Sequence, residues 1–546
     1  MNVSFFSGIQ MVKNIFWVCS PAKERILRLD HTSHQEIGFM SKSSRRRFMQ
    51  QSALAGAGFW VAGTAAANLN PRSPNERLRI AGIGVGGKGH SDITQAAQFG
   101  DVVAICDIDD ERCNKAYQDL NKGDKHNPKK YFDFRKMLDE MGKSIDAVTV
   151  STPDHTHAVA AVMAMQMGKH VYCQKPLTHT VHEARRMREI ASEMKVVTQM
   201  GNQGTAENGL RRAVELIQGG VLGQIKEIHV WTNRPVWPQS PEIVSRPASK
   251  PVPAGVHWDE FLGPAPQRAY HPSLHPFAWR GFWDFGTGAL GDMACHTVNM
   301  AFMACKLGYP TAVSAVNGPL NSETYPAWAS MMYEFPARGD MQPCKLYWYE
   351  GRVLLADGRK ASLVQPPIDI LSKCLKTDKA TGMIEKLSDS GSIIVGEKGI
   401  LFSPNDYGAK YRLYPEKDFP VEMQEKLYSG EAGPAITLAR NNGGDRGMKK
   451  EWVEGILGGA RPFSNFDYAA LFTETMLLGN VAMRVGKRLE WDGPNMRVTN
   501  CSEAQRYIQP EYRRGWSLGK SKNTDVTEMP MYEEKQGLLR RLIRRK

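Results

Sequence analysis

The stretch Gly82-Ile83-Gly84-Val85-Gly86-Gly87 decides the fold of the first half of this chain. It follows an apolar run from Leu78 to Ala81, and a second apolar run, Val102 to Cys106, ends at Asp107. A glycine-rich turn between a strand and a helix lets a pyrophosphate approach the backbone, and the helix N-terminus offers it free N–H donors. The layout therefore predicts a dinucleotide site. A glycine-rich turn in an ordinary α/β protein is the alternative, and the surrounding strand, helix and acid count against it.

The acid that ends the second run indicates which dinucleotide is bound. Asp107 lies 20 residues beyond Gly87, where its carboxylate can accept hydrogen bonds from an adenosine ribose and would repel a 2′-phosphate. We therefore expect NAD rather than NADP. Within the turn, we expect Gly82 to permit the bend, Gly84 to admit the pyrophosphate and Gly87 to let the helix pack closely. The expected cofactor-binding residues are Gly82, Gly84, Val85, Gly86, Gly87, Asp107, Thr152, Pro153, His155, Gln174 and Lys175.

The body of the chain predicts two domains, because about 480 residues are too many for one core. From Arg77 to about Met200, apolar runs alternate with helical patterns, which indicates a parallel sheet covered on both faces. We expect an α/β fold with an N-terminal Rossmann dinucleotide-binding domain over residues 77–200. The expected strands are 78–83, 102–106, 146–151, 170–173 and 196–200, with helices such as 155–167 and 179–194.

From about Gly201 the rhythm changes to longer β-type runs, which predicts a second α+β domain over residues 201–495, with a large, mainly antiparallel sheet. We expect this domain to serve substrate binding and oligomerisation. Its expected strands include 226–232, 346–349 and 391–395, and its helices include 207–218, 448–457 and 468–486. Between Pro235 and Pro276, ten prolines are interleaved with aromatic residues. A stretch of this kind is long for a connector, so we expect a functional lid or an oligomer arm.

The first 67 residues predict export. Residues 44–49, Ser-Arg-Arg-Arg-Phe-Met, precede a mildly apolar run from Ala53 to Ala67 that ends in small residues suited to a signal peptidase. The pattern resembles a twin-arginine signal peptide over residues 40–67, so we expect a periplasmic or otherwise exported protein. The run is short for a membrane span, which needs about 20 apolar residues, and an uncleaved anchor is the alternative. Residues 1–39 look like a non-native extension, which makes Met40 the expected start.

The formal net charge of +13 comes mainly from the two ends of the chain. Residues 1–67 carry eight basic and three acidic side chains, and residues 537–546 carry five basic ones. The remainder is close to neutral, which argues against a nucleic-acid partner. Residues 496–546 are expected to form a C-terminal extension whose basic tail is either solvated or in weak contact with an anionic membrane surface.

The nine cysteines are spread singly and form no C-x-x-C pair, so neither a disulfide scaffold nor a zinc site is expected. His155 and His157 alternate at a turn after an expected strand. We expect one ring on the cofactor side and one outward rather than a metal site, because no Cys or acidic cluster with ligand spacing accompanies them.

Two later motifs carry chemistry. Residues 171–177, Val-Tyr-Cys-Gln-Lys-Pro-Leu, end an expected strand, which puts Lys175 at the carboxyl edge of the sheet, where doubly wound folds bind their ligands. Within residues 286–299, Asp292 and His296 are four apart, so on a helix their side chains share one face. Taken singly, a lysine at a strand end is usually solvated and an Asp/His pair is often a surface contact.

Together with the glycine-rich turn, the turn over residues 151–157 and the segment 477–482 (Leu-Leu-Gly-Asn-Val-Ala), these motifs resemble the Gfo/Idh/MocA oxidoreductase family over roughly residues 77–492. The resemblance implies that Lys175, Asp292 and His296 are catalytic and line the place where a sugar or cyclitol hydroxyl meets the nicotinamide. Either Lys175 or His296 could take the hydroxyl proton while the carbon gives up hydride. We expect His296 to be the base, Asp292 to orient it and Lys175 to polarise the oxygen.

Two positions depart from the pattern of the family. Gln174 stands where glutamate is usual, which removes a negative charge near Lys175 and should let that lysine lose its proton more easily. Asn299 stands where an aspartate often follows the histidine, and an amide stabilises a charged partner less strongly. Both changes affect which of Lys175, Asp292 and His296 acts as acid and which as base.

Export restricts the chemistry, because an exported enzyme has no obvious nicotinamide pool to exchange with. We therefore expect a sugar or glycoside oxidoreductase with tightly bound NAD that is regenerated in the same site. The first alternative is a redox-cycling glycosidase that oxidises, eliminates, hydrates and then reduces its substrate. The second is a non-catalytic dinucleotide- or sugar-binding protein, against which the presence of Lys175, Asp292 and His296 counts.

The substrate itself is not identified by the sequence beyond a sugar or glycoside. Aromatic faces and donors suited to gripping a sugar precede the Asp292 motif and open the proline-rich stretch, although such residues are equally suited to a core or an interface. The resemblance implies a homodimer or homotetramer. The candidate substrate contacts are Asn233, Arg234, Trp237, Arg280 and Trp283.

Overall fold

The computed structural model describes residues 77–354, 360–376, 385–441 and 443–519, all of which belong to one unit of the chain. The expected extension at 1–39, the export signal at 40–67 and the basic tail at 537–546 lie outside the described residues. None of the described helices combines the length and the hydropathy that a membrane crossing requires.

The first part of the described chain is a six-stranded parallel sheet with the order β3-β2-β1-β4-β5-β6. The predicted Rossmann-type fold is therefore confirmed. The strands are β1 (Leu78–Ile83), β2 (Gly100–Cys106), β3 (Lys129–Tyr131), β4 (Ala147–Val150), β5 (His170–Cys173) and β6 (Thr198–Met200). The sequence did not predict β3, because Lys129-Lys130-Tyr131 is a short, largely polar edge strand with no apolar run.

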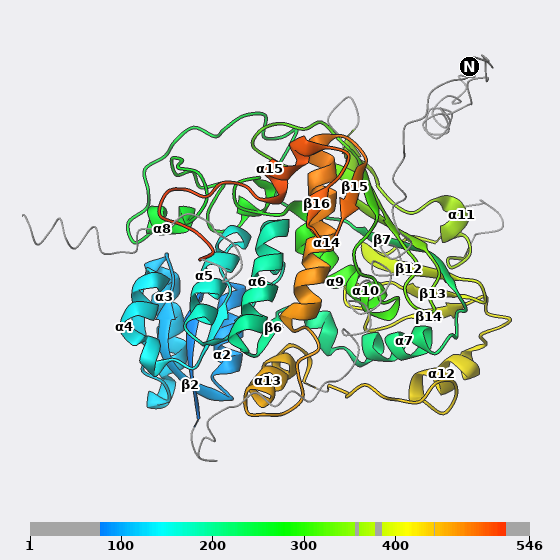
Figure 1. The fold of residues 1–546 in the computed structure, drawn as a ribbon, viewed down its shortest axis with the longest axis horizontal. Helices are drawn as coiled ribbons and strands as arrows, with labels where there is room; N and C mark the ends of the chain where they lie inside the picture. Colours follow the sequence, from blue (N-terminus) through cyan, green and yellow to red (C-terminus); the bar gives the residue numbers. More distant parts are fainter. Residues whose placement is uncertain (1–76, 355–359, 377–384, 442, 520–546) are drawn as a thin grey trace, which may run out of the picture. The chain divides into compact units, whose positions relative to one another are not determined.

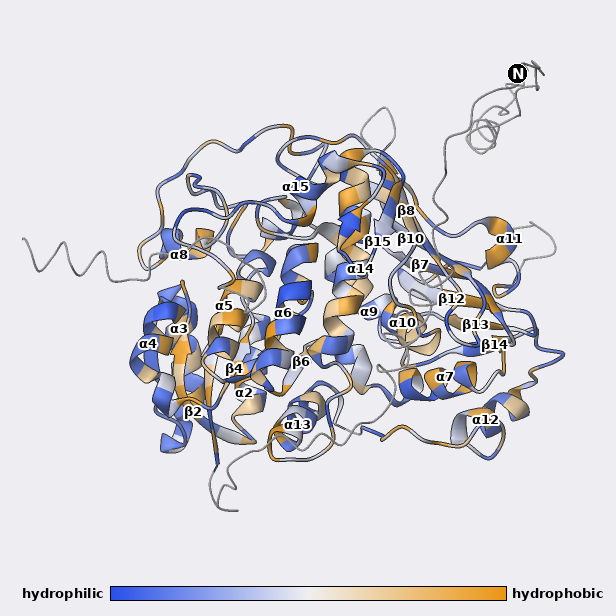
Figure 2. Ribbon diagram, in the orientation of Figure 1, coloured by the Kyte–Doolittle hydropathy of each residue, from blue (hydrophilic) through white to orange (hydrophobic). Residues whose placement is uncertain are grey.

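Helices cover both faces of this sheet (Figure 1). Alternation along β1 sends Leu78 and Ile80 into one apolar cluster and Ala81 and Ile83 into the other, as the period of two in a strand requires. Figure 2 shows α5 largely orange, in keeping with a helix that is buried along nearly its whole length. The helices are α2 (Lys88–Ala96), α3 (Asp110–Asn121), α4 (Phe134–Met141), α5 (Asp154–Gln166) and α6 (Val181–Met194), with the 3-10 turns η2 (Lys122–Asp124) and η3 (Gly142–Ser144).

The second sheet has ten strands in the order β14-β13-β12-β7-β10-β9-β8-β15-β16, with β11 paired to β10. Only β7 and β10 run parallel, so the predicted, mainly antiparallel sheet is confirmed. The strands are β7 (Ile225–Thr232), β8 (Ala312–Asn317), β9 (Trp328–Phe335), β10 (Cys344–Leu354), β11 (Lys360–Leu363), β12 (Ser390–Gly396), β13 (Ile400–Ser403), β14 (Arg412–Tyr414), β15 (Leu489–Asp492) and β16 (Arg497–Val498).

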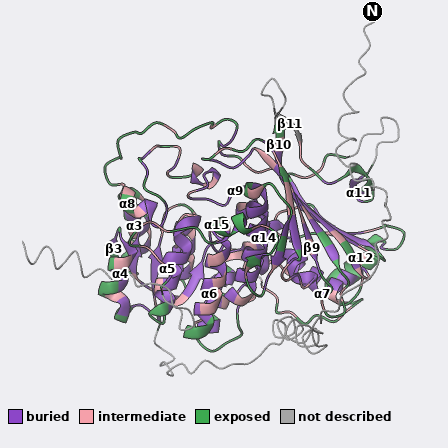
Figure 3. Cartoon of the chain, turned by 45° about the horizontal axis from the view of Figure 1, so that its top comes forward, coloured by how far each residue is buried: buried purple, intermediate pink, exposed green. Residues whose placement is uncertain are grey.

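Helices lie against one face of this sheet, and the segment around α11 lies against part of the other. In Figure 3 the helices next to the sheet are purple, whereas α12 shows green on its exposed side. The elements are η4 (Gln203–Ala206), α7 (Asn208–Gln218), α8 (Trp258–Leu262), η5 (Ala278–Gly281), α9 (Gly288–Thr297), α10 (Asn299–Ala304), α11 (Ile368–Leu371), α12 (Val421–Ser429), α13 (Gly444–Ile456), α14 (Phe466–Val485), η6 (Ser502–Ala504) and α15 (Gln505–Ile508).

Helix α13 comes from the second half of the chain but packs against the first, parallel sheet and completes its core. Its residues Met448, Trp452 and Ile456 belong to the same apolar cluster as Leu78 and Ile80 of β1. The amide nitrogen of Gln199 in β6 also donates to the Met448 carbonyl at 3.0 Å. The amino-terminal sheet is therefore covered in part by residues that come nearly 250 positions later in the chain.

The proline-rich segment, residues 235–276, contains only the short helix α8 as regular structure. It forms an antiparallel bridge between Val256 and Asp109, in the loop that follows β2. In Figure 1, α8 lies next to α3. We call residues 235–276 the strap.

Candidate active site

The glycine-rich turn joins β1 to α2. Gly84 has a φ of +74°, and a Cβ at this position would lie 2.7 Å from the carbonyl oxygen of Ser151, at the end of β4. Gly87, which caps α2, has a φ of +53°. Both conformations are open mainly to glycine. The turn therefore keeps its backbone exposed to a ligand at the point where the strand order reverses between β1 and β4, which is where doubly wound sheets bind nucleotides.

The individual glycines play roles that differ from those we predicted. The bend assigned to Gly82 is made by Gly84, and Gly82 instead makes room for the side chains of Val85 and Ile93. The close helix packing assigned to Gly87 belongs to Gly89, where a Cβ would lie 2.0 Å from the Gly84 carbonyl oxygen. The G-x-G-x-x-G spacing alone could not show this, because Gly89 lies outside it.

Asp107 is held at the end of β2 by main-chain donors. Its Oδ2 accepts hydrogen bonds from the N–H groups of Val85 at 2.8 Å and Gly86 at 2.9 Å, and its Oδ1 accepts one from Asp109 at 3.1 Å. Burial raises the pKa of Asp107, and these donors work in the opposite direction. The carboxylate is thus fixed against the glycine-rich turn, at the position predicted for the ribose contact.

A cavity of about 470 Å³ opens at the carboxyl edge of the parallel sheet, a size typical of small-molecule sites. Of the predicted cofactor residues, Gly82, Val85 and His155 do not line it. Arg112, which the sequence did not indicate, does, and its side chain lies over Gly86. The glycine-rich turn suits a pyrophosphate, Asp107 suits a ribose and Arg112 supplies a nearby positive charge, so this lining fits a dinucleotide. The predicted residues that line the cavity are Gly84, Gly86, Gly87, Asp107, Thr152, Pro153, Gln174 and Lys175.

The strap covers one side of this cavity. The Asp110 N–H donates to the Gly255 carbonyl at 2.9 Å, and the His257 N–H donates to the Ile108 carbonyl at 2.8 Å. His275 Nε2 lies 3.0 Å from Oδ2 of Asp109. These contacts tie the strap to the loop beside the cofactor residues of the same chain.

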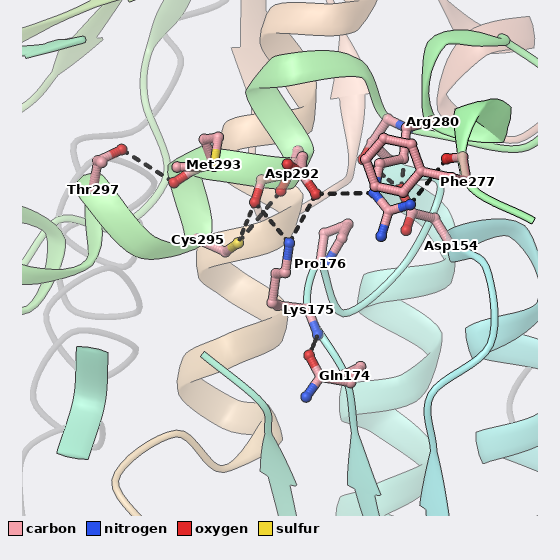
Figure 4. A network of polar contacts seen from close by, with 12 residues as sticks. Asp154, Gln174, Lys175, Pro176, Phe277, Arg280, Asp292, Met293, Cys295 and Thr297 are labelled. Carbon is pink, nitrogen blue, oxygen red and sulfur yellow. Dashed lines mark hydrogen bonds and ion pairs between the residues drawn. The ribbon is translucent and has the colours of Figure 1, made fainter. Parts of the chain in front are cut away.

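Lys175, which also lines the cavity, forms an ion pair with Asp292 (Figure 4). Its Nζ donates to Oδ1 of Asp292 at 2.8 Å and to the Asp292 carbonyl at 3.0 Å, while Arg280 Nε lies 3.4 Å from the same Oδ1. Burial lowers the pKa of Lys175, but the Asp292 carboxylate outweighs it and the pKa is raised. Burial raises the pKa of Asp292, but Lys175 and Arg280 bring it down to about 2. Both groups are therefore charged at neutral pH.

The predicted effect of Gln174 on Lys175 is wrong. Its side chain faces away from the amine: Nε2 donates to Oδ2 of Asp92 at 2.8 Å, and Oε1 accepts from the Lys175 N–H at 3.1 Å. Asp92 is fully buried and also binds Lys88 at 2.8 Å and Lys449 at 2.7 Å. Gln174 belongs to that charge network, and Asp292 determines the protonation of Lys175.

The predicted orientation of His296 by Asp292 is also wrong. The Asp292 carboxylate binds Lys175 and Arg280, and the buried Nδ1 of His296 has no hydrogen-bond partner among the described residues. The imidazole packs edge-on against Tyr407, with ring centroids 5.0 Å apart, and is not among the residues that line the cavity. Burial and the Lys175 charge lower the pKa of His296 to about 3, so the ring is neutral.

Asn299 makes its hydrogen bonds to Thr205 and Tyr468, not to Lys175, Asp292 or His296. Its Nδ2 donates to Oγ1 of Thr205 at 3.0 Å, and its Oδ1 accepts from the Tyr468 hydroxyl at 2.7 Å. All three residues are buried. The amide joins α10 to η4 and α14.

His155 and His157 are both buried, which contradicts the prediction that one ring points outward. Each ring lies between main-chain carbonyls: His155 Nε2 is 2.7 Å from the Phe261 oxygen, and His157 Nδ1 is 2.8 Å from the Pro176 oxygen. Burial lowers the pKa of His155 to about 3 and that of His157 to about 4. In the part of the chain that the structure describes, no group of three His, Cys, Asp or Glu side chains has the geometry to hold a metal.

Asp154 is a cavity residue that the sequence analysis missed, although its turn was singled out. It is the first residue of α5, and its Oδ2 accepts hydrogen bonds from Thr287, from the N–H at 3.1 Å and from Oγ1 at 2.7 Å. Burial raises the pKa of Asp154 to about 7. The adjacent histidines drew attention away from the acid, whose importance depends on burial that no local pattern reveals.

Of the candidate substrate contacts, only Arg280 lines the cavity. Trp237 and Trp283 are buried and donate to Gln239 Oε1 and to the Asn321 carbonyl. Asn233 accepts from Arg234, and neither lines the cavity.

Comparison with known proteins gives two family matches. Residues 77–202 match a family described as "Oxidoreductase family, NAD-binding Rossmann fold", and residues 213–337 match its "C-terminal alpha/beta domain". The chain is 26% identical over 185 residues to a levoglucosan dehydrogenase from Pseudarthrobacter phenanthrenivorans, a match that covers 34% of this chain and 38% of that protein.

It is also 28% identical over 204 residues to a glycosyl hydrolase family 109 protein from Saccharopolyspora erythraea, which covers 33% of this chain and 44% of that one. The chain thus spans less than half the length of these curated relatives. Among solved structures, it is similar to the WlbA dehydrogenase from Chromobacterium violaceum in complex with NADH and UDP-GlcNAcA. The TM-score is 0.52 at 16% identity, over 78% of this chain and 99% of that one, and this likeness shows the fold.

Proposed function

We propose that the protein is an exported, NAD-dependent oxidoreductase of the Gfo/Idh/MocA family, because residues 77–202 match the NAD-binding Rossmann fold of that family and residues 213–337 match its C-terminal alpha/beta domain. It acts on a sugar or glycoside hydroxyl and keeps its cofactor tightly bound. The observation that carries the proposal is that one cavity is lined both by the glycines of the turn and by the Lys175–Asp292 ion pair. Nicotinamide chemistry needs its hydroxyl-binding groups within the same enclosure as the dinucleotide.

NAD, when bound, supplies the acceptor for a hydride. The side chains of the cavity supply the hydrogen-bond donors that hold the substrate oxygen. An ammonium group has three N–H donors, and Asp292 takes two from Lys175, which leaves one to polarise a substrate oxygen. Arg280, at the same end of the cavity, offers further donors.

The strap supports the proposal of a retained cofactor. Its main-chain bridge and the His275–Asp109 contact both lie on the loop that follows Asp107, so exchange of a dinucleotide requires these contacts to open. We propose that residues 40–67 direct export by the twin-arginine route, and that the exported protein therefore cycles its hydride between substrates. We also propose a homodimer or homotetramer, to be tested by light scattering of the purified protein.

The test is to isolate the full chain under native conditions and to measure bound NAD by mass spectrometry. The protein is then incubated with a panel of sugars and glycosides while the absorbance of reduced nicotinamide is followed. Lys175→Met should abolish the signal and keep the cofactor, whereas Lys115→Met, on the exposed side of α3, should change neither. Absence of NAD together with failure to take it up would refute the proposal.

A redox-cycling glycosidase is the second candidate, and the similarity to a glycosyl hydrolase family 109 protein favours it. The same panel separates the two, because a glycosidase releases the glycone without net reduction of the cofactor. A chain that binds NAD, gives neither signal and binds ligand unchanged after Lys175→Ala would instead be a binding protein.

A further inference from the structure

Residues 509–519, which follow α15, reach the cavity that contains the glycine-rich turn. Trp516 lines this cavity together with Gly84 and Asp107. In Figure 1 the chain after α15, drawn in red, runs toward α8 of the strap. The sequence predicts only an extension over residues 496–546, so this contribution to the cavity is not apparent from local patterns.

Trp516 lies on the side of the cavity that Asp107 occupies. The Asp107 N–H donates to the Tyr131 carbonyl at 3.1 Å, where β2 pairs with β3. Phe132 and Phe134, which follow Tyr131 along the chain, also line the cavity. The Trp516 ring packs against Phe134, with ring centroids 6.0 Å apart. The indole therefore lies beside the carboxylate that is predicted to bind the adenosine ribose.

The Trp516 ring is half-buried and held in place by its neighbours. The guanidinium carbon of Arg135 lies 4.4 Å from the ring centroid, and Arg135 is bound in turn to Asp133 at 2.8 Å. Because the ring also lines the cavity, part of its aromatic surface is open to a ligand. A purine base is a flat aromatic group of the kind that stacks on tryptophan.

Arg513 fastens the 509–519 segment to the strap. Its Nε donates to the Gly263 carbonyl at 2.9 Å, and its guanidinium forms an ion pair with the Asp259 carboxylate. Further along the segment, Leu518 is buried in the main apolar cluster. The segment is therefore anchored on both sides of Trp516, to the strap and to the core.

We propose that Trp516 stacks on the adenine ring of the bound dinucleotide and that the 509–519 segment thereby holds the cofactor in the site, an inference that rests on the proposed function. The hydrogen bond between Arg513 and Gly263 joins two parts of the chain that are 250 positions apart. Both parts then enclose one ligand, and its release requires both to move away. A cofactor that is regenerated in its own site needs such an enclosure.

The experiment measures by calorimetry how the full chain, stripped of nucleotide, binds NAD and ADP-ribose, which lacks the nicotinamide. In Trp516→Ala the Kd should rise about 5- to 150-fold for both ligands, the range that the loss of one base–aromatic stack gives. Trp516→Phe keeps an aromatic face and should restore most of the affinity. Tyr507→Ala is the matched control, because Tyr507 is a half-buried aromatic residue under Arg484, outside the cavity, and both Kd values should stay unchanged.

Tryptophan fluorescence gives a readout that a merely structural role would not change. ADP-ribose should quench part of the emission of the wild type, and this part should be lost in Trp516→Phe although the ligand still binds. A quench of equal size in the two proteins would overturn the contact between Trp516 and the base.

The part played by the segment is tested by the rate at which labelled NAD leaves the full chain during a chase with unlabelled NAD. Arg513→Met should release it faster than wild type, unlike Arg514→Met at the exposed neighbouring position. Equal rates in the two variants would overturn retention by the segment.

The failure of this inference is distinguishable from that of the proposed function. A wild type that binds NAD, together with a Trp516→Ala variant that binds NAD and ADP-ribose equally well, would overturn the role of Trp516 and leave the proposed function standing. A wild type that takes up neither ligand would overturn both.

Discussion

Gln174→Glu should destabilise the protein in a strongly pH-dependent way. Gln174 Nε2 donates to Oδ2 of Asp92 at 2.8 Å, and both side chains are buried. Glutamate replaces that donor by an oxygen and so places two carboxylates in contact. The Asp92 carboxylate already accepts hydrogen bonds from Lys88, Lys449 and the Ser151 hydroxyl. These donors are therefore already engaged and cannot separate the two carboxylates.

The magnitude is limited by the cost of protonating one carboxyl. Two charges about 4 Å apart repel by about 4 kcal/mol at the effective dielectric of a protein. Taking up a proton instead costs 1.36 kcal/mol for each pH unit above a reference pKa of about 4.3, which gives about 3.7 kcal/mol at pH 7 and about 1 kcal/mol at pH 5. Because the pKa of the new carboxyl is raised in the folded state, the folded protein binds more protons than the unfolded one, and stability falls as pH rises.

Urea unfolding of wild type, Gln174→Glu and Gln342→Glu between pH 5 and pH 8 measures this difference. Gln342 is exposed, so its variant carries the same charge change without burial. The gap between wild type and Gln174→Glu should widen by about 2 to 3 kcal/mol from pH 5 to pH 7. Parallel pH dependence in the two variants would show that position 174 does not meet Asp92, and the reasoning would be wrong.

Three further changes test other parts of the site. Gly89→Ala should weaken NAD binding by about 10- to 100-fold in calorimetry, because its Cβ meets the backbone, whereas Gly308→Ala has open space and should not; equal affinities would contradict the packing. Lys449→Met should lower the free energy of unfolding by about 3 to 5 kcal/mol, since it removes one of the two lysines that pair with the fully buried Asp92; an unchanged urea midpoint would refute this. His275→Ala should speed NAD release in stopped-flow measurements, unlike His271→Ala, and equal rates would count against the strap as a lid.

Much of the fold followed from periodicity alone. The runs at Leu78–Ile83 and His170–Cys173 became β1 and β5 with the bounds that their apolar residues predict. Edge elements did not follow, since Lys129–Tyr131 lacks any apolar period. The packing of α13 under β1 was also unpredictable, because residues about 370 positions apart share no local signal.

Lys175 and Asp292 were predictable as members of the candidate site, but their pairing was not. The spacing of Asp292 and His296 placed both on α9, yet a four-residue spacing cannot show which neighbour a carboxylate prefers. In the folded chain the Asp292 carboxylate is bound by Lys175 and Arg280 and not by His296. A charged donor outcompetes a neutral imidazole for a buried carboxylate, and only the tertiary structure brings those two cations to it.

The same comparison explains how one cavity can hold two aspartates of different pKa. Both are buried, and burial alone would raise the pKa of each. Asp292 touches two cations and falls to about 2, whereas Asp154 has its hydrogen bonds from the neutral Thr287 and rises to about 7. Their surroundings thus hold two like groups of one cavity in different protonation states. Asp292 therefore fixes Lys175 in its charged form.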